Sequence, residues 1–364
     1  MPELPGISPE VERAASLVRS VAKGKLIDRV ETVEDPLVFS GISHEDFARE
    51  LTGRTVKHAA RYGKLFFLEL DGAGRMPVFH FGMTGMLQVK GQPCLHYGKS
   101  EVWPPRFMKF VLYLRDGDDH DGSNPAITQL AFSDARRLGR IRLSTSPLTE
   151  PPIVDLGFDP ILSMPSLSVF NALVQKRTCP IKALLLDQSF SAGVGNYLAD
   201  EILYHARVHP EQRCRSLSDD QTAALHHQIA DVCRIAVEAN ADDSKYPAHW
   251  LFKHRWGKGK KAEHTMKLPS GAPATIRWIT VGGRTSAYVS ELQQLSSAKT
   301  QKLDAKEDDS DLTPLSSEAE SSGDKVHNHE VILKPSPRKR KRLRGEPPST
   351  GDGVKLRRSK RTKT

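Results

Sequence analysis

The second residue of the chain, in the opening MPELPGISPEVER, has the chemistry of a nucleophile. Removal of Met1, which we expect before a residue as small as Pro2, would leave a free secondary amine. An α-amino group titrates near ~7.7–8.0 against ~10.4 for lysine, so more of it is in the neutral, nucleophilic form. Its attack on an aldehyde-like carbon gives an iminium, which is an electron sink, and Glu3 could move the protons. The alternative is a terminus with no role.

Three further residues lie where strands are expected to meet turns. Lys64 begins an apolar strand in ARYGKLFFLEL, where it is either a solvated strand end or a phosphate-facing cation. Met83 occupies a Gly-flanked turn in FHFGMTGML, where it either fills a core gap or wedges into a base stack. His80 in the same segment is expected to be packed and hydrogen-bonded.

The segment SDARRLGRIRL places three arginines at one turn: Arg136, Arg137 and Arg140. Phosphate or an orphaned base is the functional ligand for such a cluster, and a solvated basic loop is the alternative. A longer stretch, LLLDQSFSAGVGNYLADEILYHARVHP, has glycines leading into a helix that begins near Asn196. Because helix N-termini bind anions, this stretch predicts a seat for a DNA phosphate.

Residues 249–292 are basic and aromatic and are expected to be strand-like, with HTMKLPSGAPATIRWITVGGRTSAYVSEL predicting a β-hairpin and a Gly-Gly-Arg turn at Arg284. The hairpin is either a surface ribbon or a DNA-contacting finger. Its basic and aromatic residues are Lys258, Lys260, Lys261, Arg277 and Trp278.

The elements that position these residues fall into two groups. Residues 9–24 show helical spacing, and eight short runs with Gly and Asp turns over residues 25–145 predict a β-sandwich or barrel. Helices are expected at 166–177, at 179–188, from about Gly193 to Val208, and at 222–239.

Charge is concentrated beyond the predicted finger. Residues 299–364 carry 17 Lys and Arg against 11 Asp and Glu, which gives them +6 of the total net charge of +9. These residues are also poor in apolar side chains. A disordered tail used for nuclear import or polyanion contact is expected, with plain solvated disorder as the alternative. The four cysteines form no C-x-x-C pair, and no apolar run approaches a membrane span. The composition therefore predicts a soluble intracellular protein.

In this order, the motifs resemble those of formamidopyrimidine-DNA glycosylase and of the wider family that includes endonuclease VIII. The motifs are MPELP with PEVER, the GK-plus-apolar strand, HFGMTG, the D-x-RR-x-G turn, the DQ…AGVGN…ADE…HP segment and VGGRTSAY. The resemblance implies an α+β protein with four parts: a helix and β-sandwich at 1–150, a helical domain with a helix–two-turn–helix at 151–248, a zinc-free β-hairpin finger at 249–294, and a disordered basic tail at 295–364.

The resemblance also implies roles for single residues. Pro2 would attack C1′ of a flipped nucleotide, Glu3 would handle protons, and Lys64 would contact phosphate and assist β-elimination. Arg284 would assist δ-elimination and grip a phosphate together with Asn196. The remaining DNA contacts would be Met83, Arg136, Leu138, Arg177 and Lys182, with Met83 and Arg136 filling the gap left by the flipped base.

Four features depart from the family pattern. GISP stands between Pro5 and Glu10, which could displace Glu10 from the nucleophile. The finger lacks the two C-x-x-C pairs of bacterial members, so we expect no zinc, as in plant and fungal members. Leu138 replaces a wedging Phe, and a DNA-contacting His is absent near Phe107.

These features predict a bifunctional glycosylase and abasic-site lyase for oxidised purines in double-stranded DNA: formamidopyrimidines and hydantoins, with 8-oxoguanine as a further candidate. We expect a nuclear monomer that needs no cofactor or metal and has no membrane partner. Two alternatives remain, an endonuclease VIII-like activity on oxidised pyrimidines and a noncatalytic protein that binds damaged DNA or chromatin.

Overall fold

A computed structural model describes residues 8–93, 102–116, 126–258 and 266–295. The first helix, α1 (Ser8–Ala22), includes Ser8 and Pro9 of the GISP segment in its first turn. Its predicted apolar face is confirmed, because Val11, Ala15 and Val18 are buried. The helix packs against β2 (Val56–Tyr62) and β3 (Leu65–Leu70) of the following domain and against α6 (Asp219–Glu238) of the helical part.

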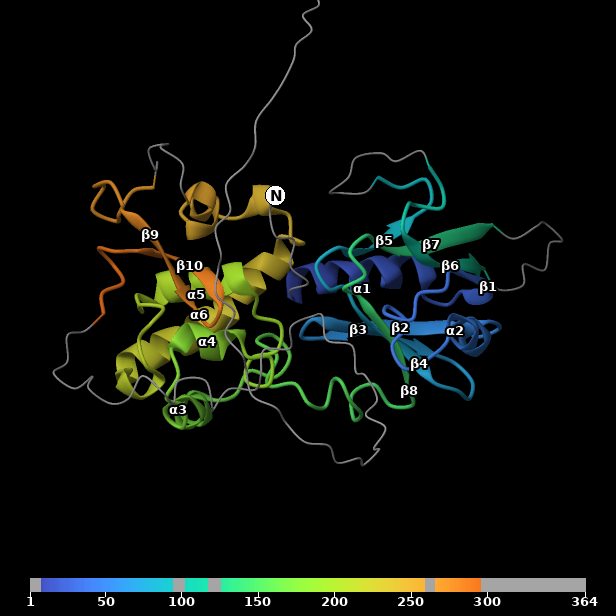
Figure 1. The fold of residues 1–364 in the computed structure, drawn as a ribbon, viewed down its shortest axis with the longest axis horizontal. Coiled ribbons are helices and arrows are strands. Elements are labelled where there is room, and N and C mark those ends of the chain that lie inside the picture. The colour runs from blue at the N-terminus through green and yellow to red at the C-terminus, as the bar shows by residue number, and fades with distance from the viewer. Residues whose placement is uncertain (1–7, 94–101, 117–125, 259–265, 296–364) are drawn as a thin grey trace, which may run out of the picture. The chain divides into compact units, whose positions relative to one another are not determined.

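All eight predicted strands form, and they make a sandwich of two antiparallel four-stranded sheets (Figure 1). One sheet has the order β1-β6-β7-β5 and the other β2-β3-β4-β8. The strands are β1 (Leu26–Thr32), β2 (Val56–Tyr62), β3 (Leu65–Leu70), β4 (Met76–His80), β5 (Gly85–Val89), β6 (Met108–Arg115), β7 (Ile127–Asp134) and β8 (Arg140–Ser144).

Aromatic residues from both sheets fill the space between them. Phe110 and Phe132 come from the first sheet, and Phe66 and Phe79 from the second; all four are buried in one cluster. Rings of the two sheets contact each other directly, with the centroids of Phe79 and Phe110 5.7 Å apart. This core holds the strand ends, from which the site residues project, in fixed positions.

One helix of the first domain was not predicted. α2 (His44–Leu51) begins after Ser43, whose hydroxyl accepts a hydrogen bond from the N–H of Asp46 at 3.0 Å. Only Phe47 and Leu51 are buried on it, so its apolar signal is two residues long. Its sequence signature is the capping residue rather than the periodicity.

The four predicted helices of the second part are confirmed with shifted bounds. They are α3 (Leu167–Gln175), α4 (Ile181–Leu186), α5 (Asn196–Ala206) and α6 (Asp219–Glu238). Leu198, Ile202 and Leu203 of α5 are fully buried, as their spacing predicted. α5 packs between α4 and α6, and it also contacts the hairpin that follows (Figure 1).

The predicted hairpin consists of β9 (Ile276–Val281) and β10 (Arg284–Val289), paired in register with Val281 opposite Arg284. The expectation of strand-like structure over 249–292 was wrong in its first part. Residues 251–257 form two short 3-10 turns, which place Leu251 in the core against Tyr204 of α5. Lys260 and Lys261 lie outside the described residues.

No helix in the described part of the chain is long and apolar enough to cross a membrane. The predicted tail from residue 296 onward lies outside the described residues.

Candidate functional site

The turn that carries Lys64 rests directly on the glycine-rich segment before α5. Gly63 has φ +57°, which favours glycine, and a Cβ there would lie 2.9 Å from the Cβ of Ala192 and 3.3 Å from the N of Gly193. The N–H of Gly63 donates to Oδ2 of Asp159 at 2.9 Å. The turn that carries Lys64 and the segment predicted to seat a phosphate are therefore packed against each other.

The carboxylate of Asp159 holds the Gly63 turn in place. It is fully buried, and its Oδ1 accepts hydrogen bonds from the N–H groups of Ile161 and Leu162 at 2.9 and 3.0 Å. Its Oδ2 also accepts from Arg61 of β2, which binds Glu12 of α1 at 2.9 Å. Because a buried carboxylate is stable only when its oxygens are satisfied, this set of donors explains an otherwise costly charge.

His80 lies at the end of β4, near Lys64. Burial, followed by the charges of Lys64, Arg142 and Arg140, lowers the pKa of His80 to about 3. The ring is therefore neutral at physiological pH, and its Nδ1 accepts a hydrogen bond from the N–H of Gly82 at 3.2 Å. The prediction of a packed, hydrogen-bonded histidine is confirmed.

The turns of Met83 and Leu138 pack against each other. A Cβ on Gly82 would lie 2.5 Å from the backbone carbon of Leu138, so only glycine fits there. Thr84 donates to Oδ1 of Asp134 at 2.5 Å, and Nη1 of Arg136 lies 3.5 Å from the sulfur of Met83. The structure thus brings together Met83 and Arg136, which are predicted to fill the gap in the DNA, and places Leu138 beside them.

Asn196 and the Arg284 turn also meet. Asn196 begins α5, and its Nδ2 donates to the main-chain carbonyl of Thr285 at 3.1 Å. Gly282 and Gly283 have φ +55° and +67°, as a two-residue turn between antiparallel strands requires. Arg284 is exposed beside them. An amide has a second N–H, so Asn196 keeps a donor for a phosphate.

Lys182 does not fit its predicted role as a direct DNA contact. Its side chain is fully buried, and its Nζ donates to Oδ1 of Asp200 at 2.6 Å and to the carbonyl of Thr285 at 3.1 Å. Oδ2 of Asp200 accepts from Arg255 at 2.7 Å and from the N–H of Ala287 at 3.1 Å. These contacts give Lys182 a structural role, because they tie the finger to α4 and α5.

Arg177 lies half-buried in the connection between α3 and α4, and its role as a DNA contact stays a prediction. Pro2 and Glu3 lie outside the described residues.

Glu10 lies in the first turn of α1, near a pair of buried tyrosines. Burial, then the charge of Glu10, raises the pKa of Tyr197. The hydroxyl groups of Tyr197 and Tyr246 are 3.0 Å apart.

Sequence reasoning missed the three aspartates that organise these turns: Asp35, Asp159 and Asp200. Each is buried and bonded to a cation distant in sequence. An isolated aspartate in a loop or helix carries no sign of a distant partner, so the sequence held no usable signal. Within the described ranges no three His, Cys, Asp or Glu side chains form a group that could hold a metal ion. The expectation of a metal-free finger stays a prediction.

A β-sandwich followed by helices α3 to α6 and a β-hairpin, with basic residues on the connecting turns, is the architecture that the resemblance implies for a DNA glycosylase with a helix–two-turn–helix. Two family models match the chain: the formamidopyrimidine-DNA glycosylase N-terminal domain over residues 1–141, and the formamidopyrimidine-DNA glycosylase H2TH domain over residues 156–247.

Curated relatives agree. Formamidopyrimidine-DNA glycosylase of Arabidopsis thaliana is 41% identical over 300 residues, which cover 81% of this chain and 71% of that protein. The protein of the same name from Bacillus subtilis is 30% identical over 301 residues, covering 80% and 99% of the two chains. The chain therefore belongs to the formamidopyrimidine-DNA glycosylase family, and it is a DNA glycosylase.

Solved structures show the same fold. The Lactococcus lactis formamidopyrimidine-DNA glycosylase bound non-covalently to DNA with an abasic site matches with a TM-score of 0.63 at 23% identity, covering 79% of this chain and all of that one. A complex of the Lactococcus lactis protein with DNA containing a formamidopyrimidine matches with a TM-score of 0.62 at 24% identity, covering 79% and 99% of the two chains.

Proposed function

We propose that this chain excises oxidised purines from double-stranded DNA and then cuts the DNA strand on both sides of the abasic site, with Pro2 as the nucleophile. The observation that carries the proposal is the seating of the Gly63–Lys64 turn on the Ala192–Gly193 segment. It places the lysine assigned to elimination beside the segment that leads into Asn196, which is assigned to the phosphate. Relatives of this family have been solved with abasic-site and formamidopyrimidine-containing DNA, which supports this substrate class.

The proposed chemistry runs through one covalent adduct. The nitrogen of Pro2 forms a bond to C1′, the C1′–base bond breaks, and the base leaves with a proton supplied through Glu3. The sugar ring opens to an iminium. Loss of a C2′ proton, assisted by Lys64, breaks the C3′–O bond, and a second elimination assisted by Arg284 breaks the C5′–O bond. Hydrolysis of the remaining iminium frees Pro2.

Borohydride trapping on an abasic-site duplex tests this proposal. We expect the parent protein to form a covalent adduct and the variant Pro2→Gly to form much less, because the primary amine of glycine gives an imine that is a cationic electron sink only when it is protonated. The adduct must form with the GISP segment in place. A parent that binds the duplex but gives no adduct contradicts the proposal. In that case a variant lacking residues 6–9 shows whether the segment blocks the site or the protein only binds DNA.

The substrate class is tested on duplexes that contain a formamidopyrimidine, a hydantoin, 8-oxoguanine or thymine glycol. We expect excision of the oxidised purines to exceed that of thymine glycol. The reverse order would assign the chain to oxidised pyrimidines. We further propose that the protein acts in the nucleus, on the strength of the basic clusters KPSPRKRKRLRG and KLRRSKRTKT, and that it acts there as a monomer.

A further inference from the structure

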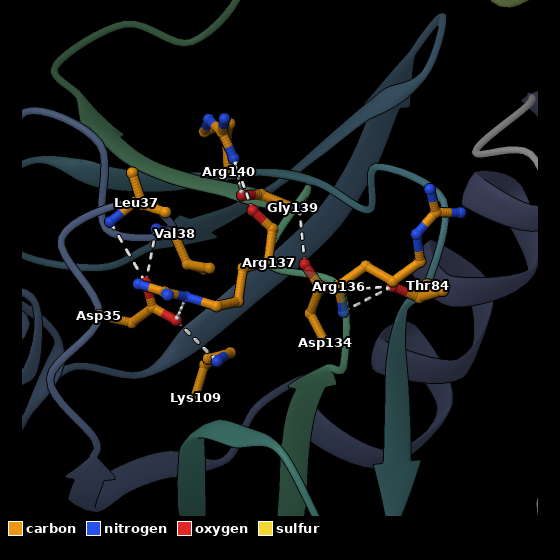
Figure 2. A network of polar contacts seen from close by, with 10 residues as sticks. All are labelled: Asp35, Leu37, Val38, Thr84, Lys109, Asp134, Arg136, Arg137, Gly139 and Arg140. Carbon is orange, nitrogen blue, oxygen red and sulfur yellow. Dashed lines mark hydrogen bonds and ion pairs between the residues drawn. The ribbon is translucent and has the colours of Figure 1, made fainter. Parts of the chain in front are cut away.

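The structure treats the three arginines of the 134–140 turn differently. The guanidinium of Arg137 binds Asp35 through two nitrogens, with Nε 3.0 Å from Oδ2 and Nη2 3.0 Å from Oδ1. Nη1 of Arg140 folds back onto the carbonyls of Arg137 and Gly139 at 3.2 and 2.8 Å. Figure 2 shows the side chain of Arg136 running the opposite way from that of Arg137, toward Thr84.

Asp35 is built to hold a cation. It is 4% exposed, and Nζ of Lys109 on β6 lies 2.7 Å from its Oδ2. The N–H groups of Leu37 and Val38 donate to its Oδ1 at 3.2 and 3.3 Å. Burial raises the pKa of Asp35, but the hydrogen bonds from Arg137 and Lys109 outweigh burial and bring it to about 2. The carboxylate is therefore ionised at neutral pH.

The backbone at this turn needs an anchor. Arg137 has φ +58°, in the left-handed region that costs a non-glycine residue roughly 1 kcal/mol or more. The Asp35 contact holds that conformation from the side-chain end. On the other side, the N–H of Arg136 donates to Thr84 and to Asp134 at 3.2 and 3.1 Å, and the N–H of Gly139 donates to Asp134 at 2.6 Å.

We propose that Asp35 is a positioning residue for the recognition of the base opposite the lesion, which acts by holding Arg137 away from the DNA and so leaves Arg136, beside Met83, as the guanidinium that reads this base. The inference rests on the proposed function. Two adjacent guanidinium groups at one turn would compete for the same base or phosphate. Asp35 reduces this competition, since its carboxylate, which it shares with Lys109, engages two nitrogens of the Arg137 guanidinium and fixes the backbone from which Arg136 projects.

The test is the binding of abasic-site duplexes with C or A opposite the gap, measured by fluorescence anisotropy, which needs no catalysis. Arg137→Met breaks the clamp and keeps the buried Asp35–Lys109 pair, so the fold should survive. We expect it to change the ratio of the two dissociation constants by about fivefold or more, because base contacts carry the discrimination. Asp35→Asn should change the ratio in the same direction.

Arg140→Met is the matched control, because it removes one charge from the same turn without touching Asp35. We expect its ratio to stay within about twofold of the parent. Single-stranded abasic DNA has no opposite base, so Arg137→Met should bind it like the Arg140→Met control. A folded Arg137→Met protein with the parental ratio overturns the inference. So does a parent that binds both duplexes equally. A parent that discriminates but gives no borohydride adduct contradicts the proposed function alone.

Discussion

At the scale of residues, the site depends on which basic side chains form ion pairs with buried carboxylates inside the protein. Arg137 and Lys182 look like DNA-binding cations in the sequence, but each is bonded to a buried aspartate. Lys64, Arg136 and Arg284 lie instead on turns at strand ends. Asp35 and Asp200 decide this difference, and the sequence gives no indication of which cations they contact.

The pH response of His80 is a prediction at this scale. The folded protein keeps the ring neutral down to about pH 3, whereas the unfolded chain takes up a proton below about pH 6.5. The unfolded state therefore binds more protons between these values, and His80 costs the folded state stability as pH falls from 6.5 toward 3. The slope is at most about 1.4 kcal/mol per pH unit.

Replacement of the ring by an amide should remove this cost. We expect His80→Gln to lose less thermal stability than the parent between pH 7 and pH 5, measured as the difference in melting temperature. The exposed His227→Gln serves as the control and should follow the parent. Equal losses in His80→Gln and the parent would show that His80 takes up its proton without unfolding.

At the scale of elements, short turns carry the site and close packing holds each of them. Strand alternation and turn residues were enough to predict all eight sandwich strands. They were not enough for α2, because two buried residues give no clear period, or for residues 251–257, whose apolar side chains pack against α5 rather than in a strand. Element type follows from local pattern, but short elements are decided by what they pack against.

Gly63→Ala tests the Lys64 turn. The added Cβ would meet Ala192 at 2.9 Å in a backbone conformation that alanine disfavours, so we expect a loss of roughly 2 kcal/mol in unfolding free energy. Strand cleavage should fall further than in the control, because the turn must move off the Gly193 segment. Gly91→Ala is that control, since it has φ +80° and no neighbour within 4 Å. Equal effects of the two substitutions on cleavage would contradict the close approach.

Lys182→Met tests the attachment of the finger. The substitution removes a fully buried cation from Asp200 and Thr285, so we expect roughly 3 kcal/mol of destabilisation and a lower melting temperature, together with weaker DNA binding. The exposed Lys176→Met should leave the melting temperature unchanged. Weaker binding by Lys182→Met at an unchanged melting temperature would instead restore Lys182 as a direct DNA contact.

At the scale of the whole molecule, the two described parts are joined by buried charge and by helix packing. Arg61 of β2 binds both Glu12 of α1 and Asp159 of the connecting segment, and α1 packs on α6. The Lys64 turn is therefore placed by contacts from both parts. Catalysis and DNA grip are expected to depend on this junction as much as on the site residues themselves.

Truncation before Ser296 tests the tail at this scale. The removed residues 299–364 carry a net charge of +6, so we expect weaker nonspecific DNA binding with a shallower salt dependence, by about one unit of slope for each phosphate that the tail neutralises in the full-length protein. A fluorescent fusion of the truncated chain should also lose nuclear accumulation, while base excision in low salt persists. If neither localisation nor salt slope changes, the tail has neither role.

The sequence by itself determined the strands, most of the helices, the hairpin turn at Gly282–Gly283, and the types of residue that carry chemistry. These follow from local properties: side-chain periodicity, helix capping and the backbone freedom of glycine. Only the tertiary structure decided which basic side chains are paired with buried carboxylates of the protein itself. A buried carboxylate needs a cationic partner, which can lie far along the chain: Asp35 pairs with Arg137, and Asp200 pairs with Lys182. No local pattern encodes such a pair.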